Sequence, residues 1–342
     1  MPLLQFLHRA AAGANLDPAE AEQAMNIILD GGASTAQIAA FLVALRMKGE
    51  TSDELLGFAR AMRERAHKIK PEIGGEPLLD TCGTGGDGLG TFNISTIVAF
   101  VVAGLGVKVA KHGNRSISSK CGSADLLERL GVQVVTDAAR TERAIEEIGI
   151  AFLFAPAFHP AMKHAQPARL ELKMRTVFNL LGPLANPAGA TAQLVGAPSE
   201  HAAGLMAGAL AALGLPRGFV VHGSDGLDEI TTAGTTVAFE VRDGRVLPRV
   251  LSPADFGVPQ ARSSDFAGGT PEENCDIALA VLNGERGPRR DIVLVNASAA
   301  LVAAGKAASF AEGVEMAGES IDSGAALRKA QDLAAFTKKG TA

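Results

Sequence analysis

The spacing of apolar residues changes near residue 70, and this change limits the chain to few architectures. Before it, capping residues start three helices, at Asp17, Ser34 and Thr51, and no strand pattern interrupts them. A proline and the run "GGEP" then end the helical stretch. We therefore predict a small helical domain over residues 1–70.

From residue 75 onward, short apolar runs alternate with helical ones, as in chains built from βαβ units. This pattern predicts an α/β domain over residues 75–342, with a mostly parallel sheet and helices on both faces. Residues 160–190 break the alternation, and part of this segment is expected to join the helical domain. Asp243-Gly244 predicts a two-residue hairpin turn. The expected strands lie in "PLLDT", "VKVAKH", "VQVV", "IAFLFAP", "AQLVGA" and "GFVVHG".

Charge and composition exclude several classes of partner. The net charge is −5 without a basic stripe, which argues against nucleic acid. The longest apolar run, from Ile97, is far shorter than the roughly 20 residues that span a bilayer. The three cysteines lack metal-type spacing, and the first residues lack a signal-peptide pattern. We expect a cytoplasmic protein that acts on small molecules, with no nucleic-acid or membrane partner.

A glycine-rich stretch, "DTCGTGGDGLGTFNIST" at 80–96, joins an expected strand to an expected helix. Gly83, Gly85 and Gly86 allow successive backbone N–H groups to converge, and the helix start adds further donors and partial positive charge. The stretch has neither the lysine of a P-loop nor the glycine spacing of a dinucleotide fingerprint. It favours a phosphate or diphosphate cradle, the alternative being a plain turn.

A second loop, "KHGNRSISSKCGSAD" at 111–125, is dense in hydrogen-bond donors. Because it holds few acids, we expect its donors to repel one another unless an anion with several oxygens binds there. The alternatives are a solvated polar loop and, for His112 alone, a structural hydrogen bond.

A third loop, "HGSDGLDEIT", holds Asp225, Asp228 and Glu229 after an expected strand. Adjacent carboxylates beside anion-binding loops suggest Mg²⁺ bridging to phosphate oxygens. Taken alone, such acids are more often solvated turn residues.

Two arginines lie on the helical run before Gly182. Arg169 or Arg175 can form a bidentate pair with a substrate carboxylate, or can pair with nearby Glu171.

The ordered set "DTCGTGGD", "NIST", "KHGNR", "GSAD", "HPAMK", "RTVFNLLGPLANP" and "GLDEIT" resembles the anthranilate phosphoribosyltransferases of tryptophan biosynthesis. The resemblance runs from the N-terminal helices to about residue 300. It implies a helical domain beside an α/β domain, a homodimer through the helical domain and two Mg²⁺ ions per subunit. It also implies that 5-phosphoribosyl 1-diphosphate (PRPP) and anthranilate react to N-(5-phosphoribosyl)anthranilate and pyrophosphate.

The resemblance also implies three groups of site residues. Magnesium ligands would be Ser95, Asp228 and Glu229. The anthranilate path would hold Gly83, His112, Asn114, Arg169 and Pro183, with Arg169 facing the carboxylate. The PRPP site would comprise Gly83, Gly86, Asp87, Thr91, Asn93, Ile94, Ser95, Thr96, Lys111, His112, Gly113, Asn114, Arg115, Ser118, Ser119 and Ser123. Cys121 stands where a serine is frequent, and no contact is assigned to it; Asp80 is expected to be structural.

Displacement of pyrophosphate mainly requires neutralising the leaving group and aligning the amine. An aromatic amine is already unprotonated at neutral pH, so we expect no side chain to be an essential proton acceptor. A pyrimidine-nucleoside phosphorylase is the nearest alternative, but it would not need the paired acids Asp228 and Glu229. A nucleic-acid-binding relative without catalysis would carry a basic surface and eroded motifs, unlike this chain.

Overall fold

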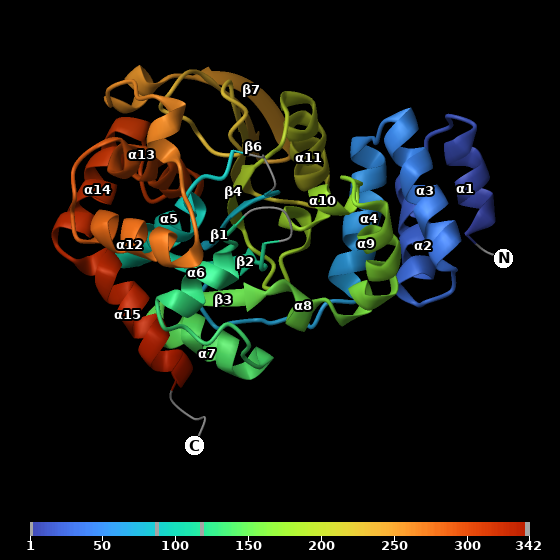
Figure 1. The fold of residues 1–342 in the computed structure, drawn as a ribbon, viewed down its shortest axis with the longest axis horizontal. Helices are drawn as coiled ribbons and strands as arrows, with labels where there is room; N and C mark the ends of the chain where they lie inside the picture. Colours follow the sequence, from blue (N-terminus) through green and yellow to red (C-terminus); the bar gives the residue numbers. More distant parts are fainter. Residues whose placement is uncertain (1–2, 86–88, 117–119, 339–342) are drawn as a thin grey trace.

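The computed structural model describes residues 3–85, 89–116 and 120–338. Four helices come first: α1 (Leu4–Ala11), α2 (Pro18–Leu29), α3 (Thr35–Lys48) and α4 (Ser52–Glu64). The predicted caps at Asp17, Ser34 and Thr51 are confirmed, since each side chain accepts a backbone N–H in a capping box. These helices form the bundle on the right of Figure 1.

A seven-stranded sheet follows, in the order β3-β2-β1-β4-β5-β6-β7. The five strands from β3 to β5 run parallel, and β6 and β7 continue antiparallel. This confirms the α/β class with a mostly parallel sheet. The strands are β1 (Leu78–Gly83), β2 (Lys108–Gly113), β3 (Ile150–Phe154), β4 (Ala192–Gly196), β5 (Arg217–Gly223), β6 (Thr236–Arg242) and β7 (Arg245–Leu251).

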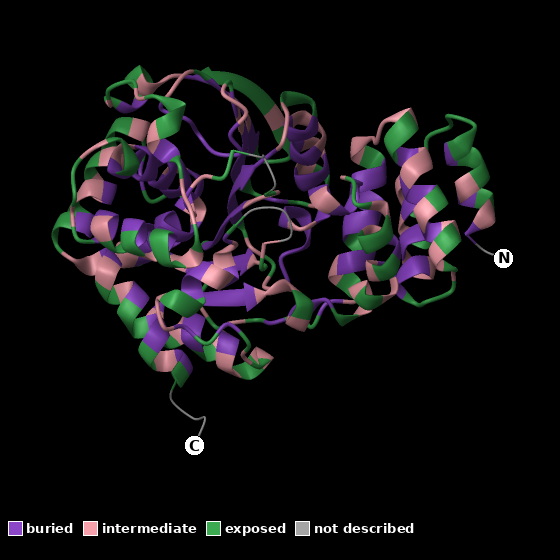
Figure 2. Cartoon of the chain, viewed as in Figure 1, coloured by how far each residue is buried: buried purple, intermediate pink, exposed green. Residues whose placement is uncertain are grey.

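Helices cover both faces of the sheet, and the buried residues gather between these layers (Figure 2). On one face α5 (Ile94–Gly104) packs against α13 (Pro288–Ala303), α14 (Phe310–Asp322) and α15 (Ala325–Lys338). On the other face α11 (Glu200–Ala212) lies between the strands and α4. The remaining helices here are α6 (Ser123–Arg129), α7 (Ala138–Ile148) and α12 (Pro271–Leu282), with short 3₁₀ turns η3 (Pro253–Phe256) and η4 (Ser263–Phe266). Within the described residues, no helix is both long and apolar enough to cross a membrane.

The segment between β3 and β4 is helical and packs beside the N-terminal bundle. It comprises α8 (Ala155–Phe158), η1 (Pro160–His164), α9 (Gln166–Leu172), α10 (Phe178–Leu181) and η2 (Pro183–Ala185). α9 contacts α3, while α10 and η2 contact α4, and their apolar side chains share one buried cluster with the bundle. The division into domains at about residue 70 stays a prediction.

The predicted strand in "VQVV" is wrong. Val132 and Val134 are buried, whereas Val135 is exposed, so the alternation reports one-sided burial without strand pairing. β3 already occupies the position beside β2, and the Gln133 N–H donates to Thr337 Oγ1 instead of to a strand.

The predicted hairpin is confirmed, since Arg242 pairs with Arg245 across Asp243-Gly244. Both turn residues have positive φ, 49° and 74°, as a two-residue turn of this kind requires.

Candidate active site

Asp228 and Glu229 lie in the loop after β5 and bind backbone groups of the glycine-rich segment. Asp228 Oδ2 accepts the Gly85 N–H at 2.9 Å, and Glu229 Oε1 accepts the Ser95 N–H at 3.1 Å. Both carboxylates are largely buried, 9 % and 7 % exposed. The two acids and the start of α5, separated by more than 130 residues in sequence, therefore meet at one place.

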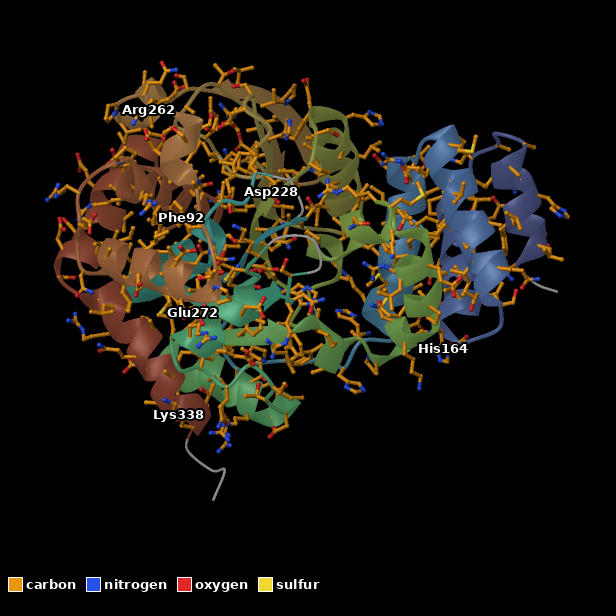
Figure 3. The ribbon with its side chains drawn as sticks, in the orientation of Figure 1. Phe92, His164, Asp228, Arg262, Glu272 and Lys338 are labelled. Atoms are coloured by element: carbon orange, nitrogen blue, oxygen red, sulfur yellow. The ribbon has the colours of Figure 1, made fainter. Side chains whose placement is uncertain are left out.

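The close approach of these segments depends on a missing side chain. A Cβ atom built on Gly83 would lie 2.5 Å from Asp228 Oδ2, nearer than real Cβ atoms come. Glycine at this position therefore lets the end of β1 lie directly against the carboxylate. Figure 3 shows Asp228 near the middle of the molecule, with Phe92 to its left in the α/β part.

A buried side chain of α13 holds the acidic loop in place. Asn296 on α13 is fully buried; its Oδ1 accepts the Ile230 N–H, and its Nδ2 donates to the Ile230 carbonyl. Asp225, by contrast, accepts from the Thr231 and Ser263 hydroxyls, which gives it a structural role in the turn.

Lys111, at the end of β2, is buried and points toward the start of α5. Its Nζ donates to the Thr81 carbonyl and lies 3.3 Å from Ser95 Oγ. Burial lowers the pKa of Lys111, and nearby Asp80 opposes that shift. The ammonium thus lies beside one of the predicted magnesium ligands.

Asp80, expected to be structural, is fully buried. Its two oxygens accept from the His112 N–H at 3.0 Å and from Asn186 Nδ2 at 2.8 Å. Burial raises the pKa of Asp80, and the hydrogen bond from Asn186 acts in the opposite direction. The carboxyl group links β1 to β2 and to the segment after η2.

His112 is a buried, neutral imidazole. Burial, helped by neighbouring His159, lowers its pKa to about 3. Its Nδ1 lies 3.1 Å from the Gly182 carbonyl, so Nδ1 carries the proton and donates. Nε2 is then an acceptor and has no hydrogen-bond partner among the described residues. The His159 ring lies 5.1 Å away between centroids.

The burial of His159 should make the stability of the fold sensitive to acid. Burial lowers its pKa to about 4, so between pH 6.5 and 4 the folded chain binds fewer protons here than the unfolded chain. Its contribution to stability is therefore present above pH 6.5 and is lost as pH falls toward 4. We compare the free energy of unfolding at pH 7.5 and at pH 5, measured by urea titration. The decrease between these two pH values should be about 2 kcal/mol smaller in His159→Asn than in the wild type. Exposed His8 supplies the control variant His8→Asn, and equal losses in all three proteins would contradict the prediction.

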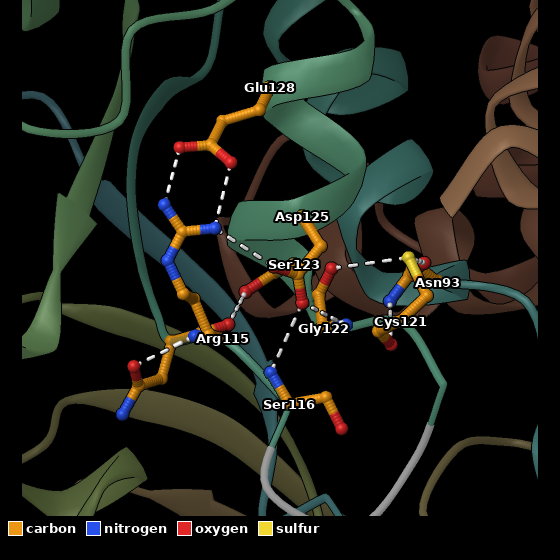
Figure 4. A network of polar contacts seen from close by, with 9 residues as sticks. Asn93, Arg115, Ser116, Cys121, Gly122, Ser123, Asp125 and Glu128 are labelled. Atoms are coloured by element: carbon orange, nitrogen blue, oxygen red, sulfur yellow. Dashed lines mark hydrogen bonds and ion pairs between the residues drawn. The ribbon is translucent and has the colours of Figure 1, made fainter. Parts of the chain in front are cut away.

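Arg115 forms ion pairs with two acids of the protein itself. Figure 4 shows its guanidinium between Asp125 and Glu128 of α6; Nη1 lies 3.0 Å from Asp125 Oδ1 and 2.7 Å from Glu128 Oε2. The expectation that the donors of this loop repel one another unless an anion binds is therefore wrong for Arg115. Asp125 is the last residue of the quoted loop, and Glu128 lies beyond it. The two acids share one face of α6, which brings both of them to Arg115.

Asn93, at the start of α5, joins the two predicted anion-binding loops. Its Nδ2 donates to the Cys121 carbonyl at 3.2 Å, and its Oδ1 accepts from Asn274 Nδ2 at 3.0 Å. Cys121, to which no contact was assigned, donates its Sγ–H to the same Oδ1 at 3.3 Å. The Asn93 side chain is thus engaged within the protein.

The other predicted PRPP residues lie around this junction. Thr91 forms a bridge with Ala267; Ile94 is buried at the start of α5; and buried Thr96 has an Oγ1 without a partner among the described residues. Ser123 Oγ donates to the carbonyl of exposed Asn114 and would collide with any Cβ on Gly113. Gly86, Asp87, Ser118 and Ser119 lie outside the described residues.

Arg169 and Pro183 lie on the helical segment between β3 and β4. The Arg169 guanidinium stacks over the Phe178 ring at 5.3 Å, and burial lowers its pKa. Buried Pro183 accepts from Gln193 Nε2 through its carbonyl, next to the Gly182 carbonyl that binds His112.

Three contacts in the site were missed from the sequence. Arg175 donates to the Gly85 carbonyl, Asn186 donates to Asp80, and Asn274 donates to Asn93. Arg169 and Arg175 were expected on one helical run, but α9 ends at Leu172. A positive φ of 47° at Lys173 redirects the chain there, so Arg175 lies outside the helix that holds Arg169. "RTVFNLLGPLANP" contains Arg175 and Asn186 and could have signalled them; Asn274 lies outside every motif.

The donor set fits a magnesium ion better than a transition metal. Among the residues that the structure describes, no three His, Cys, Asp or Glu side chains cluster as metal ligands. The predicted ligands, the carboxylates of Asp228 and Glu229 and the hydroxyl of Ser95, would leave most of a coordination sphere to substrate oxygens and water. Mg²⁺ is usually held in this way.

Comparison with known proteins places the chain in a family. Residues 4–66 match the helical bundle domain of a glycosyl transferase family, and residues 75–327 match the α/β domain of that family. The anthranilate phosphoribosyltransferase of Solibacter usitatus is 66% identical over 336 residues, which cover 98% of this chain and 99% of that protein.

Solved structures agree with this match. The anthranilate phosphoribosyltransferase of Thermus thermophilus aligns with a TM-score of 0.92 and 46% identity, over 97% of this chain and 99% of that one. The Saccharomyces cerevisiae enzyme in complex with PRPP and Mg aligns with a TM-score of 0.89 and 29% identity, over 98% of this chain and 97% of that one. The described fold and the sequence therefore agree that the chain belongs to the glycosyl transferase family, and within it to the anthranilate phosphoribosyltransferases.

Proposed function

We propose that this chain transfers the phosphoribosyl group of PRPP to the amine of anthranilate, releasing pyrophosphate, as a step of tryptophan biosynthesis. The observation that carries the proposal is the meeting of Asp228 and Glu229 with the glycine-rich loop and the start of α5. An acidic pair beside a glycine-rich loop and a helix N-terminus suits a metal-bound diphosphate, which has both negative charge and metal-bridging oxygens.

Different groups of the chain act on the diphosphate leaving group and on the anthranilate amine. The α5 N-terminus and the Lys111 ammonium supply positive charge on the diphosphate side of the site. On the acceptor side, His112 stays neutral, with its Nε2 available to accept a hydrogen bond from an amine. Because the aromatic amine needs no prior deprotonation, we propose that no side chain is an essential proton acceptor.

We propose Mg²⁺ as the metal, held by Asp228, Glu229 and the Ser95 hydroxyl. When bound, the ion would neutralise charge on the diphosphate as it leaves. Asp228 and Glu229 already fix backbone N–H groups of the loop and of α5, so they connect the metal position to the anion cradle. Two ions per subunit remain a proposal.

We propose that Arg169 binds the anthranilate carboxylate. Its guanidinium is partly buried on the Phe178 ring, and no ion pair to it is found within the described part of the chain. A desolvated guanidinium that lies over an aromatic ring is partly preorganised for a bidentate contact with a carboxylate.

We also propose a homodimer through the helical bundle and a cytoplasmic location. Adjacent helices α3 and α9 expose Met47 and Leu170, which are 83 % and 57 % accessible in the monomer. A second subunit packed on these helices would cover both apolar side chains.

A direct comparison of substrates tests the proposed reaction against the phosphorylase alternative. The purified protein is given either anthranilate, PRPP and Mg²⁺ or a pyrimidine nucleoside with inorganic phosphate. We expect pyrophosphate release in the first mixture and no free base in the second. The opposite pattern would assign the chain to the phosphorylases.

A further inference from the structure

A segment from the C-terminal third of the chain runs along the end of the glycine-rich loop. The Phe92 N–H donates to the Phe266 carbonyl at 3.2 Å, and the Gly268 N–H donates to the Gly90 carbonyl at 2.9 Å. Between these bonds, Thr91 and Ala267 form an antiparallel bridge. The loop therefore depends on residues 266–268 for its position as well as on its own strand and helix.

Asn274, on α12, connects this segment to the start of α5. Its side chain is 1 % exposed and uses both ends: Oδ1 accepts the Gly269 N–H at 2.7 Å, and Nδ2 donates to Asn93 Oδ1 at 3.0 Å. Asn93 in turn donates to the Cys121 carbonyl, in the second predicted anion-binding loop. A chain of side-chain amides thus runs from α12 to both loops.

Asn274 and Cys121 together fix the orientation of the Asn93 carboxamide. A carboxamide can be placed either way round. The Nδ2–H donor of Asn274 requires Asn93 to present Oδ1 to α12, and the Cys121 carbonyl requires Asn93 to present Nδ2 to the second loop. If Asn93 turned over, its amine would face the Asn274 amine and its oxygen would face the Cys121 carbonyl. Both contacts would then be repulsive.

We propose that Asn274 is a positioning residue for PRPP: by orienting Asn93, it sets the spacing between the glycine-rich loop and the 111–125 loop. This inference rests on the proposed function, because PRPP is the ligand that both loops would hold. Asn274 contacts no substrate; it acts through Asn93 and through its side-chain contact with Cys121.

Asn274→Asp keeps one of the two hydrogen bonds of this side chain and removes the other. The carboxylate still accepts the Gly269 N–H, but it offers Asn93 Oδ1 an acceptor where a donor is needed. We expect KM for PRPP to rise about tenfold or more at pH 8, with kcat and KM for anthranilate changed less than about threefold. At lower pH the protonated carboxyl can donate to Asn93 Oδ1, so the defect in KM should shrink as pH falls.

Four further proteins complete the experiment. Asn283→Asp, at the exposed end of the same helix, is the matched control and should behave as the wild type. Asn274→Ser keeps a hydroxyl that is too short to donate to Asn93 Oδ1 and buries no charge, so it should raise KM for PRPP at every pH. In Asn93→Ser, adding Asn274→Asp should produce no further increase.

The outcomes are separable. An unchanged KM for PRPP in both Asn274 variants, additive effects with Asn93→Ser, or failure of both Asn274 variants to fold would overturn the positioning role. Calorimetric titration with PRPP and Mg²⁺ gives the second readout. If the wild type binds PRPP but does not consume anthranilate, the proposed function fails while the titration still decides the role of Asn274. If the wild type does not bind PRPP, both fail.

Discussion

Replacing Asp228 by Asn is expected to lower kcat/KM for PRPP by about 100-fold to 1,000-fold. An Asn side chain keeps an oxygen that accepts the Gly85 N–H, so the loop should stay in place while the charge is lost. Glu229→Gln likewise keeps an acceptor for the Ser95 N–H. Both variants should need a higher Mg²⁺ concentration for half-maximal rate, measured in steady-state titrations.

Asp243→Asn is the matched control, because this acid is exposed in the β6–β7 turn and asparagine suits its positive φ. It should leave the Mg²⁺ dependence unchanged. A normal Mg²⁺ dependence in Asp228→Asn and Glu229→Gln would show that the metal assignment is wrong.

Arg169→Gln should raise KM for anthranilate by about 10-fold to 100-fold and leave KM for PRPP within about threefold. The loss of a charge-assisted, bidentate contact accounts for an effect of that size. Arg169→Lys should recover only part of the affinity, because an ammonium lacks the planar fork and stacks less well on Phe178. Initial-rate measurements with each substrate varied in turn separate the two KM values.

Arg46→Gln, on the exposed side of α3, removes the same charge without touching the site and should change neither KM. If Arg169→Gln raises KM for PRPP more than KM for anthranilate, the arginine belongs to the diphosphate side and the carboxylate assignment is wrong.

The fold was largely predictable, because it depends on signals that are local in sequence. Caps at Asp17, Ser34 and Thr51 marked helix starts, and the turn at Asp243-Gly244 marked the hairpin. The one misplaced strand, "VQVV", failed because one-sided burial under a helix gives the same alternation as strand pairing.

The site was predictable as a set of loops but not as a set of contacts. Parallel strands bring the ends of β1, β2 and β5 to one edge, so their loops could be expected to meet. Which donors would be engaged inside the protein could not be read from the sequence. Arg115 pairs with acids on α6, and Asn93 with an asparagine 181 residues away, because tertiary packing brings these partners together.

The most direct test of the account is the loss of anthranilate fluorescence on incubation with the purified protein. With PRPP and Mg²⁺ both present, anthranilate should be consumed and pyrophosphate released in equal amounts, and omission of PRPP or chelation of Mg²⁺ should abolish the consumption. Stable anthranilate fluorescence in the complete mixture would contradict the account.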